Sequence, residues 1–426
     1  MSEEFQSTPP VITRKQSLGI AFSSIVGALA VFAVTVITSK VLSPQDNAQF
    51  LVFWALMFGT FGALLGIQQE VTRASGSSQL SNAKVGRGAR LLPLAALWGS
   101  AVALLLVTTS PLWGQRILGE NYLMPVLVVA GGAILYACHV TVVGAAAGTG
   151  QWTIFAWLGS WEALIRLALV ALVALTFGSL WGFQYAVLAP VILWLLLFTV
   201  SSNGRRLGSV RGDTSASRSM RTLGWSILTS AAYAVMVTGF PVILKASVGQ
   251  TRGAEEALLL AALILGISIT RAPIMIPLQM FQGVAISAFL RQQHRPLAAL
   301  AKPLIALAGI GVLGAVAAYL VGPFLFNLLY ANYAGVLSPF TLSALTLASA
   351  IMAMVVLTGT ASLASGKHVL YLAGWALTVL VALACLYLPL DLALRSIIGL
   401  IAGPSAGVII HLGGLALRSK DTTSDV

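Results

Sequence analysis

Ser201–Thr222 reads SSNGRRLGSVRGDTSASRSMRT and is the only long internal stretch of this 426-residue sequence that is not apolar. It lies almost at the midpoint of the chain and carries five arginines against one acid, Asp213. With Gly and Ser between the charges, it cannot bury enough apolar surface to fold alone. We therefore predict a solvated basic linker between two membrane-embedded halves, rather than an arm that binds nucleic acid.

The composition of the rest of the chain indicates a membrane protein. Hydrophobic residues make up 58% of the sequence and charged residues 8%, compared with about 25% charged residues in soluble proteins. Apolar runs of about 18 residues or more recur, which is the length that crosses a hydrocarbon layer of about 30 Å. These runs are continuous rather than alternating, so they predict helices and exclude a transmembrane barrel. Glycines four residues apart, such as Gly62 and Gly66, predict close helix packing.

Polar breaks divide the chain into twelve predicted spans. We expect an all-α polytopic membrane protein with two six-helix bundles around a central cavity, formed by residues 17–200 and 223–417 on either side of the linker 201–222. Polar ends at 1–16 and 418–426 complete the chain. The predicted spans are 17–40, 49–71, 91–110, 123–148, 152–177, 182–200, 223–246, 257–289, 303–322, 337–364, 369–388 and 395–417.

The positive charges predict the orientation of these spans. Most of the 24 lysines and arginines fall in segments that share one predicted face, which includes the linker and both ends. Because basic loops remain in the cytoplasm, both termini are predicted to be cytoplasmic. We expect a multi-pass protein of the bacterial cytoplasmic (inner) membrane.

Arg271 lies near the centre of the eighth predicted span. An arginine at that depth costs about 2.5–3.5 kcal/mol on insertion scales, so it requires water or a partner. Pro273 and Pro277 follow it, and each removes a backbone donor and bends a helix. We interpret Arg271 as a cation on a kinked helix that faces a wet cavity; a structural pair between the bundles is the alternative.

Glu162 and Arg166 are four residues apart in the fifth predicted span and therefore share one helix face. Pairing would lower the cost of both charges, so a structural bridge is one interpretation and a cavity-facing pair is the other. Glu162 is the only acid deep in a predicted span, which makes it the candidate for a proton- or sodium-responsive group.

Two further pairs of charges mark the ends of spans. Glu70 and Arg73 close the second span at the predicted cytoplasmic edge, as a solvated helix end or as part of a gate. Lys40 and Lys245 end the first and seventh spans on the predicted outer face. They either reach the headgroups or supply positive charge at the mouth between the bundles.

Several signatures of other functions are absent from the sequence. It contains no GxxxxGK[ST] phosphate loop and no HExxH metal motif. Its two cysteines, Cys138 and Cys385, both lie in apolar runs, which argues against a disulfide framework or a cysteine metal site. We expect a transporter rather than an enzyme, with no cofactor and no metal.

Short motifs in the first half resemble those of a known family. Thr38–Asp46 reads TSKVLSPQD, and the span that follows it ends in QEVTR at Gln69–Arg73. Gly148–Gln151 (GTGQ) is followed by WEALIRL at Trp161–Leu167. These stretches resemble Wzx-type polysaccharide exporters of the multidrug/oligosaccharidyl-lipid/polysaccharide (MOP) superfamily, although Ser43 stands where that family usually has glycine.

The resemblance implies two six-helix bundles around a V-shaped cavity that opens alternately to each side. Members move polyprenyl-(pyro)phosphate-linked glycans across the cytoplasmic membrane, and cationic cavity residues hold the phosphate. The matching positions are Lys40, Arg73 and Arg166, to which polarity adds Arg271 and Lys245. The expected partners are a lipid-linked glycan, membrane lipids, and glycosyltransferases or a polymerase of the same pathway, with no nucleic acid.

Two other functions remain open beside a flippase for cell-envelope polysaccharide assembly. A multidrug or cation antiporter of the same superfamily would require cavity acids, and only Glu162 qualifies against several basic candidates. A membrane scaffold that does not transport would recruit glycan-assembly enzymes through the basic linker.

Overall fold

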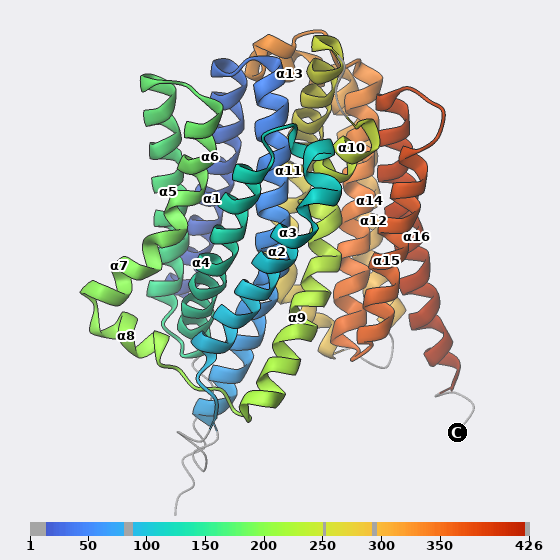
Figure 1. Cartoon of the computed structure of the whole chain (residues 1–426). Helices are drawn as coiled ribbons and strands as arrows, with labels where there is room; N and C mark the ends of the chain where they lie inside the picture. The colour runs from blue at the N-terminus through green and yellow to red at the C-terminus, as the bar shows by residue number, and fades with distance from the viewer. Residues whose placement is uncertain (1–13, 81–87, 250–252, 292–295, 422–426) are drawn as a thin grey trace, which may run out of the picture.

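The computed structural model describes residues 14–80, 88–249, 253–291 and 296–421. The predicted N-terminal arm, apart from residues 14–16, and the last five residues of the predicted C-terminal tail lie outside the described residues. The described chain is almost entirely helical, and its helices run roughly parallel to one another (Figure 1). One isolated antiparallel bridge joins Arg90 to Arg211.

The helices fall into two groups on either side of the linker, seen in Figure 1 as a blue-to-green half beside a yellow-to-red half. The N-terminal half contains α1 (Arg14–Val41), α2 (Pro44–Leu80), α3 (Leu91–Leu118), α4 (Leu123–Gly148), α5 (Trp152–Thr176), α6 (Leu180–Leu188), η1 (Ala189–Ile192) and α7 (Leu193–Val200). The linker carries α8 (Ser202–Gly208). The C-terminal half contains α9 (Ala216–Val237), α10 (Phe240–Val248), α11 (Ala254–Arg291), α12 (Pro296–Leu320), α13 (Gly322–Leu329), η2 (Ala331–Tyr333), α14 (Pro339–Ala364), α15 (His368–Leu386) and α16 (Leu392–Asp421).

The number of membrane spans agrees with the prediction from sequence. In the described residues, 11 helical segments are long and apolar enough to cross a membrane, with α6–α7 counted as one span, and the bent pair α9–α10 makes 12. Helices satisfy their own backbone hydrogen bonds, which is why apolar runs of this length become helical in lipid. The predicted fold class, a polytopic helical protein with two bundles, is confirmed.

The seventh predicted span differs from the single straight helix expected. α9 begins at Ala216, inside the stretch predicted as linker, because Ser219 and Leu223 are buried on one face while charged neighbours remain in solvent. The helix then breaks at Gly239, and α10 continues at an angle of 60°. Pro241 follows the break and has no N–H to donate to the preceding turn.

α2 is the helix that joins the two halves. It packs against α4 in its own half and against α9 and α11 in the other. A Cβ atom added at Gly66 would lie 2.1 Å from the carbonyl oxygen of Ser226, and one added at Gly62 would lie 2.7 Å from Cβ of Ala234. The close packing that these two glycines predict is therefore confirmed, and it lies between the halves.

The fourth span of each half ends in the same backbone turn. α4 is followed by Gly150, with φ of 73°, and α14 is followed by Gly366, with φ of 72°. In both turns the glycine N–H donates to a carbonyl three residues earlier, that of Ala147 at 3.1 Å and that of Leu363 at 2.9 Å. Glycine adopts this left-handed conformation without a steric penalty. The correspondence supports two halves of related architecture.

Candidate functional site

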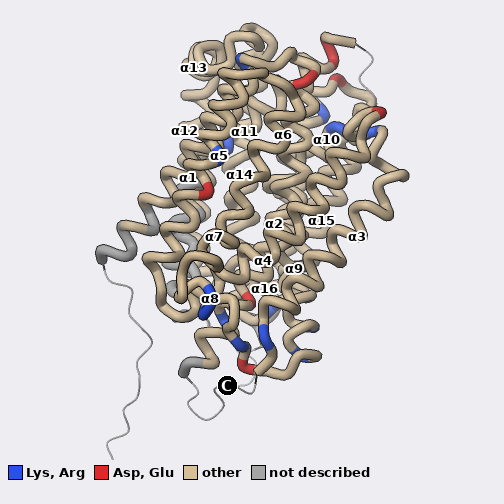
Figure 2. Tube along the Cα trace, turned by 60° about the vertical axis from the view of Figure 1, so that its left-hand side comes forward, with Lys and Arg blue, Asp and Glu red and all other residues tan. Residues whose placement is uncertain are grey.

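Charged residues gather at the two ends of the molecule, with few between them (Figure 2). We call the end that carries the linker the linker end and the end that carries the α1–α2 turn the hairpin end; they are the lower and upper ends in Figure 1. Because a charge in the apolar middle needs a partner or water, the few internal charges are the candidates for function.

One internal cluster joins α4 and α5. The Glu162 carboxylate accepts a hydrogen bond from Arg166 through Oε1, and its Oε2 lies 3.2 Å from Nε2 of His139. Arg166 is 5% exposed and His139 is 3% exposed. The ion pair that the spacing of Glu162 and Arg166 predicts is therefore present, and a histidine from the neighbouring helix completes it.

Arg166 has two further contacts that hold it in place. Its Nε donates to the carbonyl oxygen of Val187 at 3.0 Å, just before η1 begins. Its guanidinium carbon lies 5.4 Å from the centre of the Phe58 ring. The guanidinium of Arg166 therefore contacts a carboxylate, a carbonyl and an aromatic face at once. Of the two interpretations of the Glu162–Arg166 pair, these contacts favour a structural bridge.

A pocket of about 250 Å³ opens beside this cluster. It lies within the N-terminal half, where α1, α2, α4 and α5 meet. Its lining is mostly polar or aromatic and consists of Ser23, Ser24, Gln68, Tyr136, His139, Val140, Val143, Phe155, Gly159 and Glu162.

Arg271 is placed at the break between α9 and α10. Its Nη1 donates to the carbonyl oxygens of Val237 at 2.5 Å and of Met236 at 3.3 Å. These carbonyls lie at the end of α9, where the helix itself provides no further N–H groups to donate to them. Its Nε has no hydrogen-bond partner among the described residues. Arg271 therefore stabilises the bend within the C-terminal half, and its role toward a cargo remains a prediction.

The two predicted outer lysines lie in different surroundings. Lys40 is exposed at the end of α1. Lys245 is half-buried on α10 and lines a second pocket of about 380 Å³ at the hairpin end, together with Arg116 and Glu120. Positive charge in this pocket is thus shared between Lys245 and Arg116, and the sequence did not single out Arg116.

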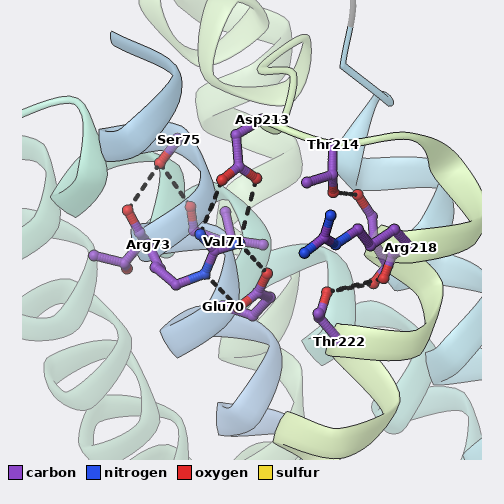
Figure 3. A network of polar contacts seen from close by, with 10 residues as sticks. Glu70, Val71, Arg73, Ser75, Asp213, Thr214, Arg218 and Thr222 are labelled. Atoms are coloured by element: carbon purple, nitrogen blue, oxygen red, sulfur yellow. Dashed lines mark hydrogen bonds and ion pairs between the residues drawn. The ribbon is translucent and has the colours of Figure 1, made fainter. Parts of the chain in front are cut away.

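At the linker end, Arg73 connects α2 to the linker (Figure 3). Its Nε and Nη2 donate to both oxygens of Glu70 at 2.9 and 2.7 Å, and its Nη1 donates to Asp213 at 2.9 Å. Glu70 is buried, whereas about half of the Arg73 side chain is exposed. The predicted pair Glu70–Arg73 is therefore present, and it extends to the acid of the linker.

Backbone hydrogen bonds reinforce this connection. The Gly212 N–H donates to the carbonyl of Ala89 at 2.9 Å, and the Ala89 N–H donates to the carbonyl of Thr214 at 3.0 Å. The Arg211 side chain donates to the carbonyl of Gly88 at 3.0 Å. The five arginines of the linker are exposed, as a solvated segment requires. Unlike a free loop, however, the linker is fixed to the segment that precedes α3 by these hydrogen bonds.

Acidification should loosen the linker. Burial alone would raise the pKa of Asp213, but the hydrogen bonds and charge of Arg73 outweigh it and hold the pKa below its ordinary value of 3.8. The contact therefore stabilises the folded state at neutral pH, and this stability is lost as the pH falls below about 4. An exposed pair of this kind contributes about 0.2–1 kcal/mol.

Hydrogen exchange at the Ala89 and Gly212 amides measures this effect. Asp213→Asn should raise the exchange rates at pH 7, after correction for the intrinsic pH dependence of exchange. The difference between wild type and variant should shrink as the pH falls below about 4. Asp46→Asn, which changes an exposed acid at the hairpin end, should leave both amides unchanged. Equal protection in wild type and Asp213→Asn would contradict the role of this carboxylate.

At the hairpin end, three hydrogen bonds join the two halves. Asn47 at the start of α2 donates to the Tyr333 hydroxyl at 2.8 Å, and Asn332 donates to the carbonyl of Ser39 at 2.9 Å. The hydroxyls of Thr35 and Tyr330 are 3.1 Å apart. We call these three contacts the hairpin-end seal; both tyrosines are completely buried in it.

Sequence reasoning missed part of these arrangements. Spacing along the chain does not reveal the contact between His139 and Glu162, because the two residues lie on different helices. The residues of the hairpin-end seal are uncharged, so polarity gave no signal for them. In the described residues, no group of three or more His, Cys, Asp or Glu side chains is arranged to hold a metal ion.

Comparison with known proteins identifies relatives by sequence. No protein-family model matches the chain. The uncharacterised protein Rv1510 of Mycobacterium tuberculosis is 31% identical over 410 residues, which cover 96% of this chain and 93% of that protein. Rv3630 of the same organism is 31% identical over 399 residues, which cover 93% and 91%.

Solved structures with a similar fold are transporters. An inward-facing multidrug resistance MATE family transporter of the MOP superfamily has a TM-score of 0.67 at 14% identity, covering 94% of this chain and 99% of that one. A MOP superfamily transporter from Pyrococcus furiosus has a TM-score of 0.64 at 14% identity, covering 95% and 96%. At such low identity the likeness concerns the fold. The chain therefore belongs to the same family as the mycobacterial proteins Rv1510 and Rv3630, and it has the fold of MOP superfamily transporters.

Proposed function

We propose that this protein is a flippase that moves a polyprenyl-(pyro)phosphate-linked saccharide across the bacterial cytoplasmic membrane by alternating access, for cell-envelope polysaccharide assembly. Its fold supports transport by movement of two halves. Both termini would be cytoplasmic, with the linker end facing the enzymes that assemble the cargo. The anionic headgroup would pass between the halves while the lipid tail stays in the membrane.

The observation that carries this proposal is that the Glu162 carboxylate is already paired with other side chains. Among the described residues Glu162 is the acid that lies deep in a span, and Arg166 and His139 already bind its carboxylate. A cationic drug would therefore find no free carboxylate in the middle of the described spans, whereas Arg271 and Lys245 supply positive charge. Fixed cations in a low-dielectric layer favour an anionic cargo.

A multidrug antiporter is the second candidate, because solved structures that share the fold include multidrug transporters. Purified protein in proteoliposomes would distinguish the two. We expect inward-to-outward movement of a fluorescent polyprenyl-pyrophosphate-linked saccharide, measured by loss of fluorescence to an impermeant quencher, and no efflux of ethidium. Ethidium transport that Glu162→Gln abolishes, without movement of the lipid, would refute the flippase.

Alternating access gives the hairpin-end seal a role as a gate. Its three contacts all join the N-terminal half to the segment around η2 of the C-terminal half. Rocking of the halves would have to break them, since each partner belongs to a different half. The seal would therefore hold the hairpin end closed while the cargo enters from the linker end.

Removing one hydroxyl should weaken this gate. Tyr333→Phe keeps the buried ring but leaves Asn47 without its partner, which should open the hairpin end about two- to tenfold more often. The measurement is the labelling rate of Ser39→Cys, a buried position in the seal, by an impermeant maleimide in a background without Cys138 and Cys385. Tyr387→Phe, an exposed tyrosine, is the matched control. An unchanged labelling rate in Tyr333→Phe would exclude the gate.

Arg271 is the strongest candidate for a cargo contact within the C-terminal half. Arg271→Ala should abolish lipid translocation while the protein remains inserted and folded, and Arg271→Lys should retain part of the activity because it keeps the charge. Translocation in proteoliposomes and the melting temperature in detergent are measured together. Full activity in Arg271→Ala would refute a cargo role, and so would a loss of activity that matches the fall in melting temperature. Arg271 would then act only as the partner of the α9 carbonyls.

A further inference from the structure

The pocket beside Glu162 has features that the transport of an anionic headgroup does not use. It lies inside the N-terminal half, between α1, α2, α4 and α5. Its volume of about 250 Å³ is below the about 300–1,000 Å³ of pockets that hold drug-sized ligands. It has room for about eight water molecules at about 30 Å³ each, which is the space of one sugar ring rather than of a glycan chain.

His139, which lines the pocket, has a buried ring nitrogen without a hydrogen-bond partner among the described residues. His139 is 3% exposed, and its Nδ1 has no hydrogen-bond partner among the described residues. Its Nε2 lies 3.2 Å from Oε2 of Glu162, so a proton on Nε2 would bridge the two groups. In the neutral ring Nδ1 is then an acceptor. A buried acceptor of this kind is satisfied by a donor that a ligand or water brings.

The other lining groups suit a polyhydroxyl compound. The Gln68 amide both donates and accepts, and Ser23 and Ser24 add hydroxyls. Tyr136 and Phe155 add aromatic surface, against which the apolar C–H groups of a sugar can pack. The negative charge of Glu162 is balanced by Arg166, so the pocket does not select an ion by net charge.

We propose that this pocket binds one neutral sugar ring of the cargo. The inference rests on the proposed function, because it assigns the saccharide part of the same lipid-linked substrate. The ring hydroxyls would donate to Nδ1 of His139 and to the remaining lone pairs of Glu162, and the Gln68 amide would bind a neighbouring hydroxyl. The phosphate groups would contact cations elsewhere, so headgroup and sugar are recognised separately.

The test compares binding of two kinds of lipid, without and with a sugar, by the full-length protein in nanodiscs. The probes are polyprenyl pyrophosphate and the same lipid linked to one glucose, galactose or N-acetylglucosamine. His139→Gln keeps a donor toward Glu162 but removes the Nδ1 acceptor, and Gln68→Ala removes the amide. Each should weaken binding of at least one sugar-linked lipid about tenfold, the effect of a lost hydrogen bond, without changing the affinity for the lipid that lacks sugar.

Gln69→Ala is the matched control, because Gln69 is the exposed neighbour of Gln68 on α2; it should bind both lipids like wild type. The proposal would be overturned if the variants lowered the affinity for the lipids with and without sugar equally, or lowered neither affinity. A shifted pH dependence of transport in His139→Gln with unchanged sugar affinity would also overturn it and assign the pocket to a proton. If wild type binds the lipids with and without sugar equally, the sugar pocket is refuted but the proposed function is not. If wild type binds neither kind of lipid, the proposed function itself is refuted.

Discussion

Replacing Arg166 with alanine should lower the free energy of unfolding by about 3–5 kcal/mol, the usual cost of removing one partner of a buried ion pair. Arg166 is 5% exposed and is the main cation on Glu162. Its loss also removes the hydrogen bond that Arg166 donates to the carbonyl of Val187. The penalty comes from leaving a carboxylate in an apolar bundle with only His139 beside it.

Thermal unfolding of the protein in detergent, followed by size-exclusion chromatography after heating, measures this loss. The double variant Glu162→Gln with Arg166→Met removes both charges and should recover much of the stability, because no unpaired charge remains. Arg116→Ala, which changes an exposed arginine at the hairpin end, should have little effect. A melting temperature of Arg166→Ala equal to that of wild type would contradict the bridge.

Gly66→Ala should separate the two halves where α2 packs on α9. The added Cβ would lie 2.1 Å from the Ser226 carbonyl oxygen, a backbone atom that cannot move without moving α9. Overpacking of this kind typically costs about 1–3 kcal/mol. The same displacement should reduce transport, because α2 is the helix that contacts both α9 and α11 of the other half.

The chain offers a matched control for this substitution. Gly131 on α4 has no atom within 4 Å of its added Cβ, so Gly131→Ala should be neutral or slightly stabilising through helix propensity. Melting temperatures of both variants, with cross-linking between α2 and α9, measure the difference. Equal stability of Gly66→Ala and Gly131→Ala would show that the contact between α2 and α9 is looser than the structure indicates.

Parts of the candidate site were predictable from local spacing. The pairs Glu162–Arg166 and Glu70–Arg73 are four and three residues apart on one helix, so helical geometry alone brings them together. That Arg271 needs a partner also follows from the sequence, since an unsatisfied guanidinium in the apolar layer is costly. Which partner it has does not follow, because the α9 carbonyls become available only through the bend at Gly239.

Other contacts had no local signal. Asp213 meets Arg73 across 140 residues, and Asn47 meets Tyr333 across 286 residues. A long-range pair of uncharged side chains leaves no trace in hydropathy or charge counts. Only the packing of whole helices decides which of their polar faces meet.

The sequence by itself determined the class of the protein, the number of its spans and the division at the basic linker. These follow from the free energy of transferring each segment into lipid, which depends on the composition of that segment alone. The tertiary structure decided that His139 completes the Glu162 cluster, that the linker is fixed to the start of α3, and that Tyr330 and Tyr333 join the halves at the hairpin end. Each of these depends on how helices distant in sequence are rotated and packed against one another, and composition does not specify that.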